Sequence, residues 1–325
     1  MQAIFSIIIP VFDPFDRSVA LGALQRALSG ALGLVGRREV VIVNNSPALS
    51  CPNLSHYLRT VCESAPADVK LVEATKNLGT ARGFNLGLRE IRPDSTFVVF
   101  MSQDCDIVEE ETLQKVELAL SEYPEIGIAH PYSVYEDSRA FNVSRKYSTS
   151  AFLRLVRGNA SPTVGDIGDA ELKRICERVG RRAGVTLTAN FPLTFAVLRR
   201  ELLQAVGTFD DGIELGCHET DDLAYRARLG RFEVARLNGV FVNHRRFLFR
   251  HICVGGTPLA AALPHQDALK QSGEWWRRKW GRPYTELYAR LRLGPTFFWA
   301  LAPYFVARRF AGRVRRAFFW KRWAA

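Results

Sequence analysis

Short runs of apolar and β-branched residues alternate with amphipathic stretches over the first hundred positions of the chain. Four runs have the length and composition of strands, at residues 4–12, 38–44, 69–73 and 96–101. The segments between them have the pattern of helices, at residues 17–33, 52–64 and 80–91. Strands that alternate with helices predict an α/β fold with a mostly parallel sheet and helices on both of its faces.

The pattern is less regular in the second half of the chain. Residues 132–185 lack a clear period, apart from a charged, helix-like stretch at 169–184. We interpret them as an insertion or as an element that binds an acceptor substrate. Residues 187–206 predict another strand followed by a helix. Residues 223–232 again have helical spacing, directly after a group of acidic residues.

Positive charge is concentrated at the end of the chain. Residues 275–325 contain 13 Lys and Arg against a single acid, Glu286, and carry a net charge of +12, whereas the whole chain carries +11. All six Trp lie in the same segment. Cations interleaved with aromatic side chains predict a helical tail that lies on an anionic membrane surface. Packing on the main domain and nucleic-acid binding are the alternatives, and a charge confined to a terminal segment disfavours the latter.

The remaining composition excludes several classes of protein. The six Cys include no C-x-x-C pair, which predicts reduced thiols in the cytoplasm and excludes zinc ribbons and dithiol redox sites. The first residues lack a basic region, and Pro10 breaks their apolar run, which is not the pattern of a signal peptide. The longest later apolar run, residues 297–307, is shorter than the roughly 20 residues that a membrane-spanning helix needs.

Polar and turn-forming residues follow each of the four early strands at the point where the strand ends. They occupy residues 10–13, 44–47, 76–79 and 102–106. In open α/β sheets, ligands bind beyond the carboxyl ends of the strands, where these four groups are expected to converge. The sequence therefore predicts a nucleotide site at this edge of the sheet.

Two of these loops carry recognisable chemistry. Asp104 and Asp106 follow a buried strand and are candidates to bind a divalent cation such as Mg²⁺ or Mn²⁺, which would neutralise a diphosphate leaving group. A solvated loop or a helix cap is the alternative for such a short pattern. Residues 77–85 place two glycines at the start of a helix, where backbone N–H groups and Arg82 favour an anionic ligand; a tight packed turn is the alternative.

Glu219, Asp221 and Asp222 lie together at the start of another predicted helix. Helix capping and the macrodipole favour one acid at such a position but do not require three. Crowded carboxylates raise one another's pKa, which suits a general base. His244 ends a further strand-like run, and it is a candidate metal or phosphate ligand only if it faces the edge that carries Asp104.

In this order and spacing, the motifs resemble those of the inverting family 2 glycosyltransferases with the GT-A fold. The bacterial surface-polysaccharide and rhamnosyltransferase-like members are the most similar. The resemblance covers about residues 4–250, and its most distinctive piece is KNLGTARGFNLGLRE, at residues 76–90. It implies a Rossmann-like, mostly parallel sheet flanked by helices, with the basic aromatic tail as an added element.

The resemblance also implies a role for each matching residue. The base and ribose would be lined by Pro10, Val11, Phe12, Asp13 and Asn44. The nucleoside diphosphate would be held by Asn77, Gly79, Arg82 and Asn85, together with Gln103 and Asp104. The metal ligands would be Asp104, Asp106 and His244. The general base would come from Glu219, Asp221 and Asp222, of which we prefer Asp221.

Three departures from the family pattern bear on these roles. Asn44 stands where the second strand usually ends in Asp. The sequence SQDCD at residues 102–106 permits two registers of the D-x-D motif, and one of them leaves Asp106 outside the site. Thr220 falls at the position of the base when the helix motif is aligned on Leu223 and Arg226, and a shift of one residue is needed to place Asp221 or Asp222 there.

The implied function is hexosyl or rhamnosyl transfer from a dTDP- or UDP-sugar to a hydroxyl of a glycan or polyprenyl-linked acceptor. The expected setting is synthesis of bacterial O-antigen, capsule or lipopolysaccharide. A nucleotidyltransferase and a non-catalytic nucleotide-sugar-binding protein are the alternatives. The expected domains are a catalytic domain at 1–255, with nucleotide and acceptor halves at 1–110 and 111–255, and an extension at 256–325. That extension would contact the inner face of the cell membrane and no nucleic acid; the oligomeric state is open.

Overall fold

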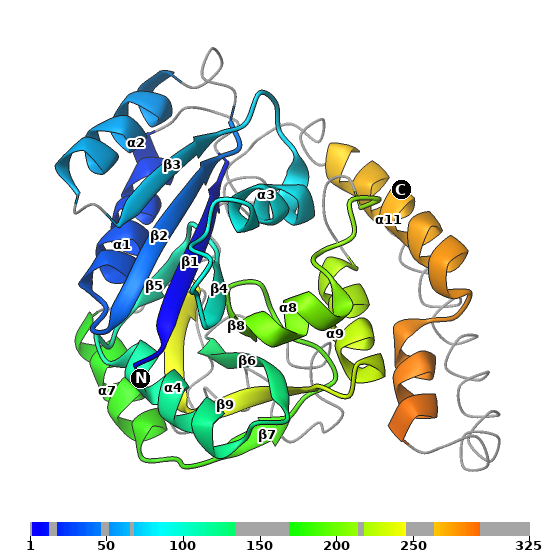
Figure 1. The fold of residues 1–325 in the computed structure, drawn as a ribbon. Helices are drawn as coiled ribbons and strands as arrows, with labels where there is room; N and C mark the ends of the chain where they lie inside the picture. The colour runs from blue at the N-terminus through cyan, green and yellow to red at the C-terminus, as the bar shows by residue number, and fades with distance from the viewer. Residues whose placement is uncertain are drawn as a thin grey trace, which may run out of the picture. The chain divides into compact units, whose positions relative to one another are not determined.

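The structure is a computed structural model. It describes residues 2–12, 18–46, 52–65, 68–133, 169–213, 218–244 and 263–292. Strands from both halves of the chain form one nine-stranded sheet, in the order β3-β2-β1-β4-β8-β6-β9-β5, with β7 paired to β9 (Figure 1).

The strands of the first half all run in the same direction. They are β1 (Ile4–Val11), β2 (Arg37–Asn44), β3 (Val69–Glu73) and β4 (Phe97–Met101). Strand β1 pairs in parallel with both β2 and β4, and β2 pairs in parallel with β3. The four predicted strands are confirmed to within one residue at each end.

The strands that follow β4 make the sheet mixed. They are β5 (Cys105–Ile107), β6 (Ile126–Ser133), β7 (Val185–Leu187), β8 (Phe195–Arg199) and β9 (Glu233–His244). Strand β8 lies antiparallel to both β4 and β6, and β6 is parallel to β9. Because two successive reversals restore the original direction, β9 ends at the same edge of the sheet as β1 and β4.

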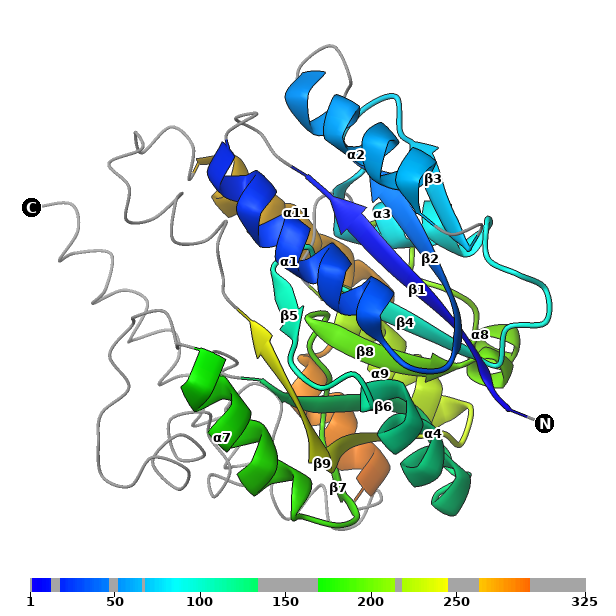
Figure 2. The same ribbon diagram turned by 90° about the vertical axis from the view of Figure 1, so that its left-hand side faces the viewer.

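Helices cover both faces of the sheet, as predicted (Figures 1 and 2). One face is covered by α1 (Ser18–Gly33), α2 (Pro52–Ser64), α4 (Thr112–Glu122) and α7 (Asp169–Gly180). The other carries α3 (Gly79–Leu88), α8 (Arg200–Val206) and α9 (Glu219–Leu229). Alternate residues of β1, Phe5, Ile7 and Ile9, enter the core beneath α1, as the two-residue period of a strand requires.

Helix α3 lies unusually close to the sheet. A Cβ atom at Gly87 would lie 2.4 Å from Ile8 Cγ2 and 3.0 Å from Val43 Cγ2, so only glycine permits this approach. Phe84 on α3 packs against Phe100 of β4 with ring centroids 4.5 Å apart. These contacts hold the middle and the end of α3 against the sheet, and the start of the helix faces the edge where the strands end.

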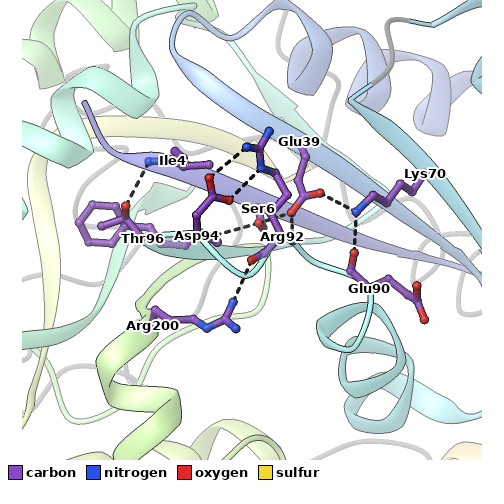
Figure 3. Close-up of polar contacts among 11 residues, drawn as sticks. Ile4, Ser6, Glu39, Lys70, Glu90, Arg92, Asp94, Thr96 and Arg200 are labelled. Atoms are coloured by element: carbon purple, nitrogen blue, oxygen red, sulfur yellow. Dashed lines mark hydrogen bonds and ion pairs between the residues drawn. The ribbon is translucent and has the colours of Figure 1, made fainter. Parts of the chain in front are cut away.

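A buried carboxylate, Glu39, holds the opposite end of the same layer (Figure 3). Its Oε1 accepts hydrogen bonds from Ser6 Oγ and from the Arg92 amide, both at 2.5 Å, and its Oε2 lies 3.0 Å from Lys70 Nζ. The Arg92 amide belongs to the segment that follows α3. Glu39 therefore joins β1, β2 and β3 to that segment in a single charged network.

Replacing Glu39 with Ala is expected to lower the free energy of unfolding by roughly 2–4 kcal/mol, because buried donors and an ammonium group lose their common acceptor. Urea denaturation measures the change. The matched control is Glu90→Ala: this side chain is exposed, and only its backbone carbonyl accepts a bond from Lys70. Equal stability of the two variants would contradict the assignment.

The chain divides into two compact units, Met1–Trp275 and Trp276–Ala325. The boundary falls inside α11 (Leu263–Trp280), and residues 284–292 are also helical. Within the first unit, the Trp275 indole lies against Gly212. None of the helices in the described ranges combines the length and hydropathy that a membrane span needs. Most of the predicted membrane-binding tail, residues 293–325, lies outside the described residues.

Candidate active site

Most strands of the sheet have one end at the same edge. Strands β1, β2, β3, β4, β6 and β9 all end there, and β5 and β8 begin there because they run in the opposite direction. The Ser102 amide donates a hydrogen bond to the Thr194 carbonyl at 3.0 Å, which ties the end of β4 to the start of β8. The predicted convergence of polar groups at this edge is therefore what the topology produces.

Gln103 fixes the segment that follows β1. Its Oε1 accepts a hydrogen bond from the Phe12 amide at 2.7 Å, and its Nε2 donates to the Phe12 carbonyl at 2.8 Å. Both ends of the side-chain amide are thus used to hold Pro10, Val11 and Phe12 in place. Gln103 positions the expected nucleoside-binding segment rather than extending toward a ligand. Asp13 lies outside the described residues.

Asparagine side chains build the loops after β2 and β3. Asn44 is fully buried, with Nδ2 donating to Ser55 Oγ at 3.1 Å and Oδ1 accepting from the Ser46 amide. Asn45 reaches across to the next loop, where its Oδ1 accepts from the Leu78 amide at 2.8 Å and its Nδ2 donates to Asn77 Oδ1 at 3.1 Å.

The start of α3 is shaped by the same asparagines. The Gly79 amide donates to Asn77 Oδ1 at 2.9 Å, and the Gly79 carbonyl accepts from Asn45 Nδ2 at 3.1 Å. Gly79 has a φ of +76°, in the left-handed region that favours glycine. Asn45, Asn77 and Gly79 thus set the entry to α3, which presents its N-terminus at the edge where the strands end.

Asn85 and Arg82 on α3 bind the turn that follows α8. Asn85 exchanges two hydrogen bonds with the backbone of Phe209, and its Nδ2 also donates to Asp211 Oδ1 at 2.8 Å. Arg82 Nε donates to the Asp211 carbonyl at 2.8 Å. Asn85 therefore connects α3 to the 209–211 turn, whereas the terminal nitrogens of Arg82 have no partner among the described residues.

Asp104 and His244 face each other. His244 Nε2 lies 3.4 Å from Asp104 Oδ1, and His244 Nδ1 is 3.0 Å from Thr194 Oγ1. Ser102 Oγ also donates to Asp104 Oδ1. The condition placed on His244 from the sequence, that it must lie on the Asp104 side, is met because β9 runs in the same direction as β4.

Asp106 does not join this pair. Within β5, Cys105 lies opposite His244 and Asp106 lies opposite Asn243, so Asp106 points to the other face of the sheet. Its Oδ2 accepts from Asn243 Nδ2 at 3.2 Å, and its Oδ1 lies 3.7 Å from Arg26 Nε on α1. The expectation that Asp104 and Asp106 share one cation is not supported by this arrangement, and the register that uses Ser102, Gln103 and Asp104 fits better.

Asp104 and His244 suit a divalent ion of the kind expected. Two ligands at about 2.1 Å from an octahedral ion and at right angles to each other lie about 3 Å apart, close to their observed separation. The Thr194 hydroxyl fixes the orientation of the His244 ring, as the outer partners of metal-bound histidines do. The described part of the chain contains no group of three or more His, Cys, Asp or Glu arranged for a metal. The remaining ligands would then be donor phosphates and water.

At the head of α9, Asp221 is held on both of its oxygens. Oδ1 accepts from Asn190 Nδ2, and Oδ2 lies 2.8 Å from His218 Nδ1. Asn190 Nδ2 also donates to Thr220 Oγ1 at 3.2 Å, and Asn190 Oδ1 accepts from the Phe191 amide. Asp221 therefore links Asn190, in the segment before β8, to His218 at the start of α9.

Asp222 is placed differently from its neighbours. It is fully buried, and its Oδ2 forms an ion pair with Arg226 Nε at 2.8 Å, one helical turn further on. Arg226 also donates to the carbonyls of Val206, Gly207 and Thr208 at the end of α8. The Asp222 carboxylate thus holds α9 against α8, and this geometry does not support its expected role as a base.

Glu219 has the most perturbed carboxyl group of the three. Burial raises its pKa from 4.5 to about 7, and the nearby charge of Asp221 contributes in the same direction. Its Oε2 is buried and has no hydrogen-bond partner in the described part of the chain. A carboxyl group with this pKa changes charge near neutral pH.

The raised pKa of Glu219 predicts a pH-dependent difference between wild type and Glu219→Gln. The folded state holds the proton between about pH 4.5 and 7 while the unfolded state releases it, so this group contributes stability that is lost as the pH rises through 7. The Gln variant should match wild type at pH 4.5 and be more stable by about 1–3 kcal/mol at pH 8. Urea denaturation at the two pH values measures this, and a difference that does not change with pH would contradict it.

One short segment links the acidic helix to the Asp104 site. Asn190 contacts Thr220 and Asp221, and Thr194 of the same segment contacts His244. Four residues of extended chain span at most about 14 Å. The residues expected to bind metal and those expected to act as the base are therefore neighbours, although they are about 115 positions apart in the sequence.

Four residues of this site were not predicted from the sequence as site residues. They are Asn45, Asn190, Thr194 and His218. Asn45 is adjacent to the residue that was selected, and His218 directly precedes the acidic group, so both carried a weak local signal. Asn190 and Thr194 lie in the apolar sequence TANFPLTF, which gave no signal because their roles depend on contacts with distant strands.

Comparisons with known proteins bear on the family and the fold of the chain. The family model "Glycosyl transferase family 2" matches residues 6–207, which exclude α9 and β9. No curated protein matches the chain. Among solved structures, GalNAc-T7 with UDP, GalNAc and Mn²⁺ is similar with a TM-score of 0.53 and 12% identity, over 75% of this chain and 44% of that one.

A second similar structure is the mannosyltransferase PcManGT from Pyrobaculum calidifontis in complex with GDP-Man and Mn²⁺. It has a TM-score of 0.51 and 17% identity, over 94% of this chain and 75% of that one. Both likenesses concern the fold, which is that of the GT-A glycosyltransferases. Since the family model covers more than half of its length, the chain belongs to glycosyltransferase family 2.

Proposed function

We propose that this protein is an inverting, metal-dependent glycosyltransferase that moves a sugar from a nucleoside-diphosphate donor to an acceptor hydroxyl. One observation carries the proposal. Asp104 and His244 face each other at 3.4 Å where the strands end, and the 190–194 segment connects this pair to Asp221. The residues proposed to hold the metal and the diphosphate therefore lie near the residues proposed to accept the proton.

The residues divide the chemistry between them. A divalent ion held by Asp104 and His244 would supply Lewis-acid stabilisation of the diphosphate leaving group. Arg82 and the N-terminus of α3 bind the same phosphates through charge-assisted and backbone hydrogen bonds. The head of α9 receives the proton of the attacking hydroxyl. A single displacement of this kind inverts the anomeric carbon through an oxocarbenium-like transition state.

The donor is proposed to be a dTDP- or UDP-sugar that carries a hexosyl or rhamnosyl group. Side-chain amides hold much of the loops that carry Phe12, Asn44 and Asn45, through Gln103 and the two asparagines themselves, and such neutral polar groups suit recognition of a base and ribose. The two structural neighbours were solved with UDP and with GDP-Man, so the fold accepts more than one nucleotide.

The acceptor is proposed to be a glycan or polyprenyl-linked intermediate of bacterial surface-polysaccharide synthesis. Support comes from the net charge of +12 and the six Trp in residues 275–325, a composition suited to the anionic inner face of the cell membrane. In this proposal, residues 1–255 transfer the sugar and the C-terminal extension binds the membrane surface. Flotation with anionic and neutral liposomes tests this part, and equal binding to both would contradict it.

A calorimetric screen tests the proposed donor chemistry. UDP, dTDP and GDP are each titrated into the protein with and without Mn²⁺, and the corresponding sugar nucleotides are then assayed for release of the nucleoside diphosphate. The expected result is one preferred nucleotide whose binding is strengthened by Mn²⁺. Binding of a nucleoside diphosphate without any turnover of its sugar would indicate a binding protein, and absence of nucleotide binding would contradict the proposal.

A further inference from the structure

We propose that His218 and Asp221 act as a dyad, in which His218 Nε2 takes the proton of the acceptor hydroxyl and Asp221 orients the imidazole. The inference rests on the glycosyl transfer proposed above and assigns its proton acceptor. It differs from the sequence-based preference for Asp221 itself as the base. The assignment follows from how each group at the head of α9 is held.

Both carboxylate oxygens of Asp221 are engaged by neighbouring side chains. One oxygen accepts from Asn190, and the other lies 2.8 Å from His218 Nδ1. A carboxylate engaged on both oxygens holds other groups in place. The arrangement corresponds to the histidine and the carboxylate of a catalytic triad, where the carboxylate fixes the tautomer and direction of the histidine.

The Asp221 contact determines which His218 nitrogen can accept a proton. When Nδ1 carries hydrogen and donates it to Asp221, the lone pair lies on Nε2. The His218 side chain is 35% exposed, compared with 22% for Asp221, so the imidazole is the more accessible of the two to an incoming acceptor. Asp221 and Glu219, both on α9, are among the charged groups that face it in the described part of the chain.

Two further observations indicate that this position serves a ligand. His218 has a φ of +67°, a left-handed conformation that is unfavourable for a non-glycine residue, and such residues cluster at functional sites. Next to it, the buried Oε2 of Glu219 has no hydrogen-bond partner within the described ranges. A sugar hydroxyl bound at the head of α9 would supply one.

The proposed step balances without any further reactant. The acceptor oxygen forms a bond to the anomeric carbon as the bond from that carbon to the diphosphate oxygen breaks, and its electron pair leaves with the diphosphate. His218 Nε2 takes the hydroxyl proton, and the imidazolium is stabilised by Asp221. The proton then passes to solvent after the products leave.

The left-handed backbone at His218 allows two substitutions that remove the imidazole without straining the chain. His218→Gly suits a φ of +67° and leaves space for a free imidazole, so the variant is expected to fold. His218→Asn also tolerates this backbone and can still donate to Asp221, but it cannot take a proton. The probe is the nucleotide sugar selected by the calorimetric screen, with water and then alkyl glycosides as acceptors.

Both variants should lose turnover by a factor on the order of 10²–10⁴ while their affinity for the nucleoside diphosphate with Mn²⁺ stays within threefold of wild type. Added imidazole should restore turnover to His218→Gly in a concentration-dependent manner, and should leave wild type and His218→Asn unchanged. Rescue of this kind would not follow from a purely structural role.

Either of two results would overturn the dyad. One is His218→Asn with turnover close to wild type; the other is a His218→Gly variant that is folded and inactive but gains nothing from imidazole. Failure of the proposed function is distinguishable, because wild type itself would then bind no nucleotide or turn over no sugar donor.

Discussion

Asp104→Asn is expected to lower glycosyl transfer by roughly 10²–10³-fold. The variant keeps the shape of the side chain but removes the negative charge that, with His244, would hold the cation. A more weakly held cation would stabilise the departing diphosphate less in the transition state. The Mn²⁺ concentration needed for half-maximal rate should also rise. Initial rates measured across a Mn²⁺ titration report both quantities.

Asp106→Asn is the matched control for Asp104→Asn. It is the same substitution two residues further on, at a side chain that faces Asn243 and Arg26 on the other side of the sheet. Its Mn²⁺ dependence should remain that of wild type. If Asp106→Asn changed the metal requirement and Asp104→Asn did not, the D-x-D register assigned here would be wrong.

Asp222→Ala is expected to lower the free energy of unfolding by about 3–5 kcal/mol, because it removes the buried partner of Arg226 and leaves a guanidinium in a poorly hydrated position. Arg226 also binds three carbonyls at the end of α8, so the loss of the carboxylate that orients it should weaken the contact between α9 and α8. Chemical denaturation followed by circular dichroism measures the loss.

Asp94→Ala provides the comparison, since Asp94 forms an exposed ion pair with Arg92 and should leave stability close to that of wild type. A stable Asp222→Ala protein that binds nucleotide normally and has lost turnover would instead support Asp222 as the base. Comparing Asp222→Ala with Asp94→Ala therefore distinguishes a structural role of Asp222 from a role as the general base.

The elements of the first half of the chain were predictable because each depends on its own sequence pattern. Strands such as β1 and β2 are continuous apolar runs, and α1 and α3 have helical spacing bounded by Gly or Pro signals. The alternation of strands and helices then predicted that these strands run parallel to one another. The strand boundaries were correct to within one residue because local preference and burial favour the same residues, whereas α3 ends at Leu88, three residues before the predicted end.

The second half was less predictable because its arrangement depends on pairing between distant segments. Nothing within residues 195–199 indicates that this strand inserts between β4 and β6 in the opposite direction, yet that insertion aligns the end of β9 with the end of β4. The same reversal places Thr194 beside His244. A strand's direction in the sheet follows from its neighbours, which the pattern of one segment does not contain.

The candidate site shows the same division. Motif positions such as Asp104, Asn77 and Gly79 were correctly located at the edge where the strands end. The partners that define their roles were not, because Gln103 binds Phe12 and Asn85 binds the 209–211 turn across long sequence separations. Asp106 was ambiguous for a related reason: the face on which it lies depends on its register with Asn243.

The central claim is that Asp104 and His244 hold a cation against the donor diphosphate, beside the head of α9. A crystal structure with the preferred nucleoside diphosphate and Mn²⁺, with data collected at the manganese absorption edge, tests it most directly. The account predicts one anomalous peak between Asp104, His244 and the phosphates, with His218 and Asp221 on the side where the acceptor enters. A peak at Asp106, or a bound nucleotide distant from Asp104, would contradict it.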